Sequence, residues 1–200
     1  YCSEAIAHYI ARETAIESGT LQSANSLILC LDNSISGNET YQLTSDKNRI
    51  IISASTPVGL FYGVQTFLQL LSTAENDAVQ RAIPELKITD SPRFAYRGMH
   101  LDVSRHFFSV DEVKKYIDLL ALFKFNYFHW HLTDGAGWRI EIKKHPLLTR
   151  KTAFRPYNNW KEWRHNPIYV DEGDPSGKGG YYTQEEIKEV IDYAAERYIT

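Results

Sequence analysis

Residues 96–134 constrain the fold of this chain more than any other segment does. An apolar run ends in polar and ring side chains at 102–108, and an amphipathic stretch with helical spacing follows it. A second apolar run ends in another polar cluster at 129–134. This order predicts a strand, a helix and a second strand parallel to the first. Because the carboxyl ends of parallel strands carry function, both clusters hold candidate site residues.

The rest of the second half repeats this pattern. Strands are expected at 98–103 and 125–132, and capping boxes at Ser109–Glu112 and Thr183–Glu186 each begin a helix. Residues 135–180 contain many Pro, Gly, Asn and Trp and are expected to form a long functional loop. We therefore interpret residues 93–200 as the first two β/α units of a TIM (β/α)8 barrel. The barrel is incomplete, because a full one needs about 250 residues.

Residues 1–92 have a different pattern, which predicts a non-catalytic α+β sandwich domain. A helix is expected at 1–16 and strands at 26–31, 39–44, 49–54 and 83–89, with the second and third strands forming a hairpin. Thr56 is the expected N-cap of a further helix, and Gly59 and Gly63 are expected to let that helix approach the sheet closely. No acid, base or nucleophile clusters in this part of the sequence, so we predict a structural role for it.

Charge, hydropathy and the chain ends narrow the class of protein. A net charge of −3 and a pI near 6.2 give no basic excess, so a nucleic-acid partner is not expected. No run of 18 apolar residues occurs, and no membrane association is expected. Of the two cysteines, Cys2 and Cys30, free buried thiols are favoured over a disulfide. The first residue is Tyr1 and the only Met is Met99, so we expect a piece of a longer protein and leave its compartment open.

Four polar residues at the two strand ends are the main candidates for chemistry. Arg105, among aromatic rings, suits either binding of sugar hydroxyls or a structural ion pair with Asp102, and the sequence does not decide between them. His129 and His131 share one strand face, where together with Asp134 they would suit a divalent metal. The favoured interpretation is that one histidine is a hydrogen-bonded residue of the site wall and the other packs in the core against Trp130. Asp134 could orient a neighbouring imidazole or bind a ligand hydroxyl. Equally, it could be a solvated aspartate of the loop or a capping residue.

Aromatic and acidic residues elsewhere give weaker signals. Three tryptophans of the long loop would stack on a sugar if exposed, but packing within the loop is the default expectation: Trp138, Trp160 and Trp163. The adjacent acids at 111–112 and 185–186 lie in first turns of helices, where they complement the helix dipole. The sequence therefore offers no convincing general acid for glycoside hydrolysis.

Three motifs together resemble the family 20 glycoside hydrolases, the β-N-acetylhexosaminidases. They are Arg-Gly-Met-His-Leu-Asp-Val-Ser-Arg-His-Phe-Phe at 97–108, Phe-His-Trp-His-Leu-Thr-Asp at 128–134 and Gly-Trp-Arg-Ile-Glu-Ile at 137–142. Residues 49–71 are similar to the end of that family's non-catalytic domain, so the resemblance covers about residues 39–200.

The resemblance implies a retaining enzyme that removes terminal β-linked N-acetylhexosamine, with glycans ending in N-acetylglucosamine or N-acetylgalactosamine as partners. In its substrate-assisted mechanism the sugar's acetamido oxygen attacks the anomeric carbon, and a Glu with a neighbouring Asp assists. By position, Arg105 binds the O3 and O4 hydroxyls, Asp134 supports the acid/base through a histidine of a later strand, and His131 lies in the site wall. The resemblance implies no metal or other cofactor, and a secreted, periplasmic or lysosomal parent protein.

This chain departs from the family's pattern at one decisive point. The catalytic Asp-Glu pair follows the fourth barrel strand, which these 200 residues do not reach, so we expect the chain alone to be inactive. Two alternatives stay open. One is a metal-dependent barrel hydrolase that uses His129, His131 and Asp134, and the other is a carbohydrate-binding module. Exposed barrel strand edges are expected to favour self-association.

Overall fold

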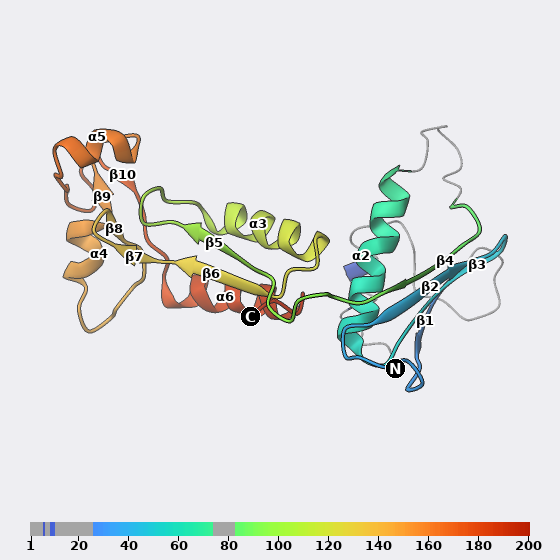
Figure 1. Ribbon diagram of the computed structural model, residues 1–200. Coiled ribbons are helices and arrows are strands. Elements are labelled where there is room, and N and C mark those ends of the chain that lie inside the picture. Colours follow the sequence, from blue (N-terminus) through green and yellow to red (C-terminus); the bar gives the residue numbers. More distant parts are fainter. Residues whose placement is uncertain (1–5, 7–8, 11–25, 74–82) are drawn as a thin grey trace. The chain divides into compact units, whose positions relative to one another are not determined.

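The computed structural model describes residues 6, 9–10, 26–73 and 83–200 and divides into two compact units (Figure 1). Unit 1 comprises the described residues up to Ala95 together with Leu122–Lys124, and unit 2 comprises Tyr96–Ala121 and Phe125–Thr200. Cys2 and most of the helix predicted at 1–16 lie outside the described residues. Among the described helices, none combines the length and apolar character needed to cross a membrane.

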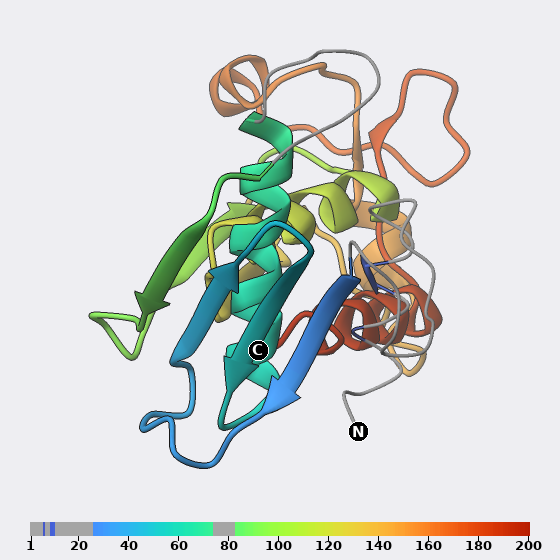
Figure 2. The same ribbon diagram turned by 90° about the vertical axis from the view of Figure 1, so that its right-hand side faces the viewer.

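The sheet of unit 1 has four strands in the order β1-β3-β2-β4, seen side by side in Figure 2. Their bounds are Ser26–Leu31 for β1, Tyr41–Ser45 for β2, Arg49–Ala54 for β3 and Leu86–Asp90 for β4. β2 and β3 form the predicted antiparallel hairpin, β1 runs parallel to β3, and β4 runs antiparallel to β2. β4 begins later than the predicted residue 83, because Pro84 has no N–H to donate to a strand partner.

Helix α2, Pro57–Thr73, lies against one face of this sheet (Figure 2). As predicted, the Thr56 hydroxyl caps it, and it accepts from the Gly59 N–H at 3.2 Å. The helix packs so closely that a Cβ on Gly63 would lie 2.4 Å from Ile52 Cγ2. The close approach expected from the glycine pair is confirmed.

Cys30 corrects an expectation from the sequence. Its thiol is free, but it is exposed rather than buried. It lies in the edge strand β1 opposite Ser53 and therefore shares the sheet face of Ser53. The neighbouring residues Ile52 and Ala54, whose side chains point to the other face, are the buried ones.

Unit 2 is built on two parallel strands, β5 at Gly98–Asp102 and β6 at Tyr127–His131. Helices α3, Val110–Leu122, and α6, Gln184–Ala195, follow the two strands (Figure 1). Both predicted capping boxes are present. The Glu112 carboxylate accepts from the Ser109 N–H at 2.7 Å, and the Glu186 carboxylate accepts from the Thr183 N–H at 2.8 Å.

The two helices cover one face of the β5–β6 sheet. On this face the Phe128 ring lies 5.7 Å from the α3 ring of Tyr116, and the Trp130 ring lies 4.6 Å from that of Tyr182. An ion pair joins α3 to the segment after α6, because Arg197 Nε donates to Asp118 at 2.7 Å. The opposite face of the sheet carries the alternate residues of both strands.

Thr200 lies beside β6 and continues the sheet hydrogen bonding. Its carbonyl accepts from the Phe128 N–H at 2.8 Å, and its own N–H donates to the Asn126 carbonyl at 3.0 Å. The Tyr127 N–H instead donates to the Arg97 carbonyl, next to β5. Since neighbouring N–H groups of a strand point to opposite sides, Thr200 lies on the side of β6 away from β5.

Residues 135–180, predicted as one long functional loop, contain several short helices and strands. They carry the short elements β8 at Gly137–Trp138, α4 at Leu147–Thr152, β9 at Phe154–Arg155, α5 at Trp160–His165 and β10 at Lys178–Gly179. β8 pairs with β7, Thr133–Asp134, and β9 pairs with β10. Two of its tryptophans make contacts within the segment, as predicted. Trp138 donates to the Ile140 carbonyl, and the Trp163 ring lies 5.8 Å from that of Tyr169.

Candidate functional site

Arg105 joins the polar ends of β5 and β6. Its Nη1 donates to Asp102 Oδ2 at 3.1 Å and to Asp134 Oδ2 at 2.5 Å, and it lies 3.3 Å from His131 Nε2. The structure therefore brings together three of the four residues that the sequence singled out at the two strand ends, namely Arg105, His131 and Asp134. All polar contacts of the guanidinium use Nη1, so Nε and Nη2 have no acceptor among the described residues. The side chain is 38% exposed, which leaves these donors open to a ligand.

The turn after β5 presents Arg105. Asp102 Oδ1 accepts from the N–H groups of Ser104 and Arg105, at 3.0 and 3.1 Å. Such local bonds let a short polar side chain fix a turn. Asp102 thus uses one oxygen to set the Arg105 backbone and the other to bind its guanidinium. The structural ion pair left open by the sequence is present, and it does not use all the donors of Arg105.

Asp134 begins a tight hairpin after β6. Its Oδ1 accepts from the Gly135 N–H at 2.6 Å, and its Oδ2 lies 3.1 Å from His131 Nε2. The Gly135 N–H, the His131 ring and the Arg105 guanidinium hold the pKa of the Asp134 carboxyl at about 2, below its ordinary 3.8. The group is therefore a carboxylate at any pH near neutrality.

Two buried arginines that sequence reasoning missed hold this site in place. Arg139 is 1% exposed, and its Nε and Nη2 donate to the carbonyls of Val103 and Ser104, at 3.1 and 3.0 Å. Its Nη1 donates to the carbonyls of Ala153 and Gly180. Burial first, and then the charge of the second arginine, Arg155, lower the pKa of Arg139 to about 10. It still carries its charge at neutral pH.

Arg155 connects the two strand ends directly. It is 3% exposed, and its Nη2 donates to the carbonyl of Arg105 while its Nη1 donates to that of Ala136 at 3.3 Å. Ser104, which is also buried, donates from Oγ to the Gly137 carbonyl at 2.9 Å. Arginines in a polar loop are usually exposed, so composition gave no signal for these contacts. The glycine at 137 was a partial signal, because a Cβ there would lie 2.5 Å from Arg139 Cζ.

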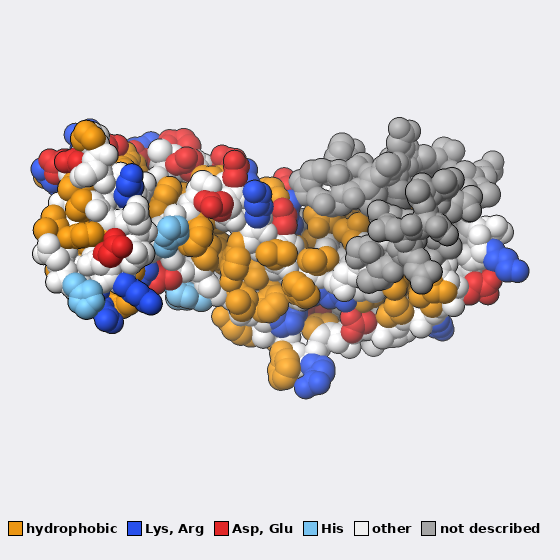
Figure 3. Space-filling model, turned by 90° about the horizontal axis from the view of Figure 1, so that it is seen from above, with side chains coloured by type: hydrophobic (Ala, Val, Ile, Leu, Met, Phe, Trp, Pro, Cys, Tyr) orange, Lys and Arg blue, Asp and Glu red, His pale blue; other side chains and the backbone are white. Residues whose placement is uncertain are grey.

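His129 and His131 converge as predicted, with ring centroids 5.7 Å apart. His100 of β5 lies beside both, and one ring nitrogen of each of the three histidines lies within 4.8 Å of the others, while Asp134 contacts His131 of this group at 3.1 Å. His129 is exposed, and it points to the opposite sheet face from Trp130, its neighbour in the strand. Histidine and apolar side chains both reach the surface of this unit (Figure 3).

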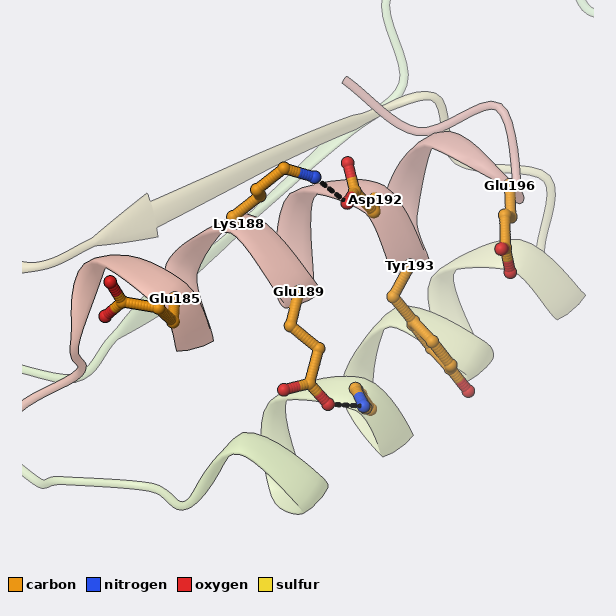
Figure 4. Close-up of a pocket in the computed structure, with 7 residues that line it drawn as sticks. Glu185, Lys188, Glu189, Asp192, Tyr193 and Glu196 are labelled. Atoms are coloured by element: carbon orange, nitrogen blue, oxygen red, sulfur yellow. Dashed lines mark hydrogen bonds and ion pairs between the residues drawn. The ribbon is translucent and has the colours of Figure 1, made fainter.

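Three other acidic residues of unit 2 stand in the first turns of helices. The pair Glu185 and Glu186 stands in the first turn of α6, as expected, and Glu112 caps α3. A shallow groove of about 450 Å³ between α3 and α6 is lined mainly by charged residues (Figure 4). Its cations are already paired, Lys114 with Glu189 and Lys188 with Asp192. We therefore place the candidate site at the strand ends.

The fold and this site define a β/α protein with polar chemistry at the carboxyl ends of parallel strands. Comparison with known proteins then gives the family. Residues 94–200 match the family description "Glycosyl hydrolase family 20, catalytic domain", and residues 3–91 match "Glycosyl hydrolase family 20, domain 2". The chain belongs to glycosyl hydrolase family 20, a family of glycoside hydrolases. The match to its second domain begins well before the predicted residue 39.

Curated relatives and solved structures agree with this assignment. A β-hexosaminidase of Porphyromonas gingivalis is 40% identical over 92% of this chain, and one of Vibrio furnissii is 46% identical over 80%. The chain covers 22% and 25% of these two relatives. A family 20 exo-β-N-acetylglucosaminidase from Vibrio harveyi, solved with N-acetylglucosamine, matches with a TM-score of 0.78 and 37% identity. That match covers 100% of this chain and 30% of the other.

Proposed function

We propose that this chain supplies part of the substrate site of a β-N-acetylhexosaminidase, which removes terminal non-reducing β-linked N-acetylhexosamine from glycans. The observation that carries the proposal is the state of Arg105. Two carboxylates fix its Nη1, while Nε and Nη2 have no acceptor among the described residues. Three N–H donors in one plane suit two neighbouring hydroxyls of a sugar ring, which is the role that the family resemblance gives this residue.

The proposed roles of His131 and Asp134 follow from the same cluster. Asp134 contacts both Arg105 and His131, so one carboxylate sets the position of a donor and of an imidazole. In the proposed site Asp134 supports the acid/base group and His131 forms part of the wall. The reaction proposed for the whole protein is retaining and substrate-assisted, with the substrate's acetamido oxygen as the nucleophile, as in the family 20 exception to the two-carboxylate rule.

These 200 residues alone are proposed to be inactive. The acids that contact Arg105 in the described part of the chain are Asp102 and Asp134, and both are paired with it. A general acid needs a raised pKa so that it holds its proton near neutrality, and the pKa of Asp134 is lowered to about 2. Asp134 is therefore unsuited to be the proton donor, and in the proposed reaction that donor is a residue outside these 200.

The test uses the 200-residue chain and a chimera, in which the chain replaces the matching segment of the Porphyromonas gingivalis β-hexosaminidase. Both are assayed for release of p-nitrophenol from p-nitrophenyl N-acetyl-β-D-glucosaminide, with the unmodified relative as the positive control. We expect hydrolysis by the chimera and none by the chain. Hydrolysis by the chain would show that the account of the missing acid is wrong.

Two further results would favour the alternative functions. A folded chimera without activity, combined with measurable binding of N-acetylglucosamine by the chain, would support a binding module. Activity that chelators remove and zinc restores would support a metal-dependent hydrolase. Far-ultraviolet circular dichroism of each protein shows whether it is folded, so a misfolded chimera is not counted against the proposal.

A further inference from the structure

We propose that Tyr169 is a positioning residue of the site and acts on Asp134 through the backbone of Gly135. The Tyr169 hydroxyl donates a hydrogen bond to the Gly135 carbonyl. The Gly135 N–H in turn donates to Asp134 Oδ1 at 2.6 Å. The effect on catalysis rests on the proposed function, because Asp134 is the residue that supports the acid/base group in the proposed site.

The turn between β7 and β8 is held by side chains from other parts of unit 2. Three successive carbonyls accept hydrogen bonds there: that of Gly135 from Tyr169, that of Ala136 from Arg155 at 3.3 Å, and that of Gly137 from Ser104 at 2.9 Å. A glycine backbone has a wider range of conformations than any other residue, so Gly135 gains most from such an anchor. Because Gly135 directly follows Asp134, its anchor is also the one nearest to that carboxylate.

Tyr169 is itself fixed on both sides. Its ring packs against Trp163 of α5, with the ring centroids 5.8 Å apart. The next residue, Val170, donates its N–H to the Phe154 carbonyl at 3.0 Å and so ties the chain to β9. The hydroxyl of Tyr169 therefore reaches Gly135 from a defined position.

Tyr169 has the protonation state that this role needs. Burial raises the pKa of its phenol, although the charges of Arg139 and Arg155 oppose the shift. The hydroxyl therefore keeps its proton at neutral pH. Only the protonated phenol can donate to a carbonyl oxygen.

The bond at Asp134 Oδ1 sets the direction of the other carboxylate oxygen. Because a carboxylate is planar, a donor fixed at Oδ1 favours the rotation that points Oδ2 toward Arg105 and His131, at 2.5 and 3.1 Å. The same bond is first among the contacts that lower the pKa of the Asp134 carboxyl. Loss of the anchor at Gly135 should therefore loosen the carboxylate that contacts both other site residues.

The first experiment compares proton–nitrogen correlation spectra of the 200-residue chain and of Tyr169→Phe. Phenylalanine keeps the ring that packs against Trp163 and removes only the hydroxyl. We expect the Gly135 amide proton signal to move upfield, and its exchange with solvent to accelerate roughly 2- to 12-fold, the range for loss of one ordinary hydrogen bond. Tyr181→Phe is the matched control, because it removes a hydroxyl that bonds to Glu172 at 3.2 Å, and it should leave this signal unchanged.

The second experiment measures kcat and KM of the same two variants in the chimera described above. Tyr169→Phe should lower kcat roughly 2- to 12-fold and change KM less, because support of the acid/base group matters most in the transition state. Tyr181→Phe should keep both constants. Circular dichroism establishes that each variant is folded.

The two experiments separate the possible failures. A Gly135 signal that Tyr169→Phe leaves unchanged would overturn the proposal, whatever happens to the rate. A displaced signal with unchanged kcat would also overturn it, because Tyr169 would then be purely structural. A folded natural chimera without activity would contradict the proposed function instead, and the spectra would still decide whether Tyr169 holds Gly135.

Discussion

Arg155 donates a hydrogen bond from Nη2 to the backbone carbonyl of Arg105, 50 residues earlier in the chain. Its Nη1 reaches the carbonyl of Ala136, in the hairpin that also carries Asp134. One buried side chain therefore fixes the backbones that present the two ends of the Arg105–Asp134 ion pair. We regard Arg155 as a positioning residue, because it acts on the site through the backbone carbonyls of Arg105 and Ala136.

Arg155→Leu should destabilise unit 2, because it leaves two carbonyl groups without their donors. The expected loss in the free energy of unfolding is about 1–3 kcal/mol, measured by urea denaturation of the 200-residue chain. Arg155→Lys should recover part of it, since an ammonium is a point donor and cannot reproduce the planar fork. Arg150→Leu is the control, because Arg150 is exposed and its contact with Glu172 spans 3.9 Å.

The positioning role has its own measurement in the active chimera. Under conditions where Arg155→Lys is fully folded, we expect kcat/KM to fall while the control variant keeps its value. A displaced guanidinium weakens binding of the sugar in both ground and transition states, so KM should rise more than kcat falls. A stability loss with unchanged kinetic constants would reduce Arg155 to a purely structural residue.

Arg105→Ala should remove the proposed contacts to the sugar hydroxyls. Hydrogen bonds from a charged donor are worth about 1.5–3 kcal/mol, so kcat/KM of the chimera should fall roughly 10- to 160-fold. Stability should change little, since the side chain is 38% exposed and exposed ion pairs contribute about 0–1 kcal/mol. The check is steady-state kinetics beside urea denaturation, and an unchanged kcat/KM would contradict the role proposed for Arg105.

The cap of α3 gives a prediction about pH. Hydrogen bonds from Ser109, through its N–H first and then its hydroxyl, lower the pKa of Glu112 below its ordinary 4.5. Because the folded-state pKa is the lower one, the carboxylate stabilises the fold above about pH 4.5, and this stabilisation is lost as pH falls through the folded pKa. The stability difference between the natural chain and Glu112→Gln should therefore shrink on acidification.

Thermal unfolding between pH 7 and pH 3 measures this difference. Ser109→Ala and the double variant complete a cycle, in which the two single changes should be non-additive because they break the same capping box. The prediction is contradicted if the stability difference between the natural chain and Glu112→Gln stays constant down to pH 3. It is also contradicted if the stability changes of the two single variants add up to that of the double variant.

Much of the local structure was predictable because it depends on nearby residues. The capping boxes at Ser109 and Thr183 and the cap at Thr56 involve partners at most three residues apart, and each is present. The convergence of His129 and His131 also follows from the two-residue repeat of a strand. The expectation that Cys30 is buried was wrong, because exposure at a sheet edge depends on which strand lies outermost.

The amino-acid pattern alone was enough to predict the order of strands and helices, the helix starts and the polar clusters at the strand ends, together with the family that these motifs resemble. Which distant groups meet became clear from the folded chain. The register of β5 against β6 brought His100 to His129, and folding of residues 135–180 brought Arg139 and Arg155 beneath Arg105. The physical reason is that buried carbonyl groups need donors, and a buried arginine can supply them from any position in the chain once packing excludes water.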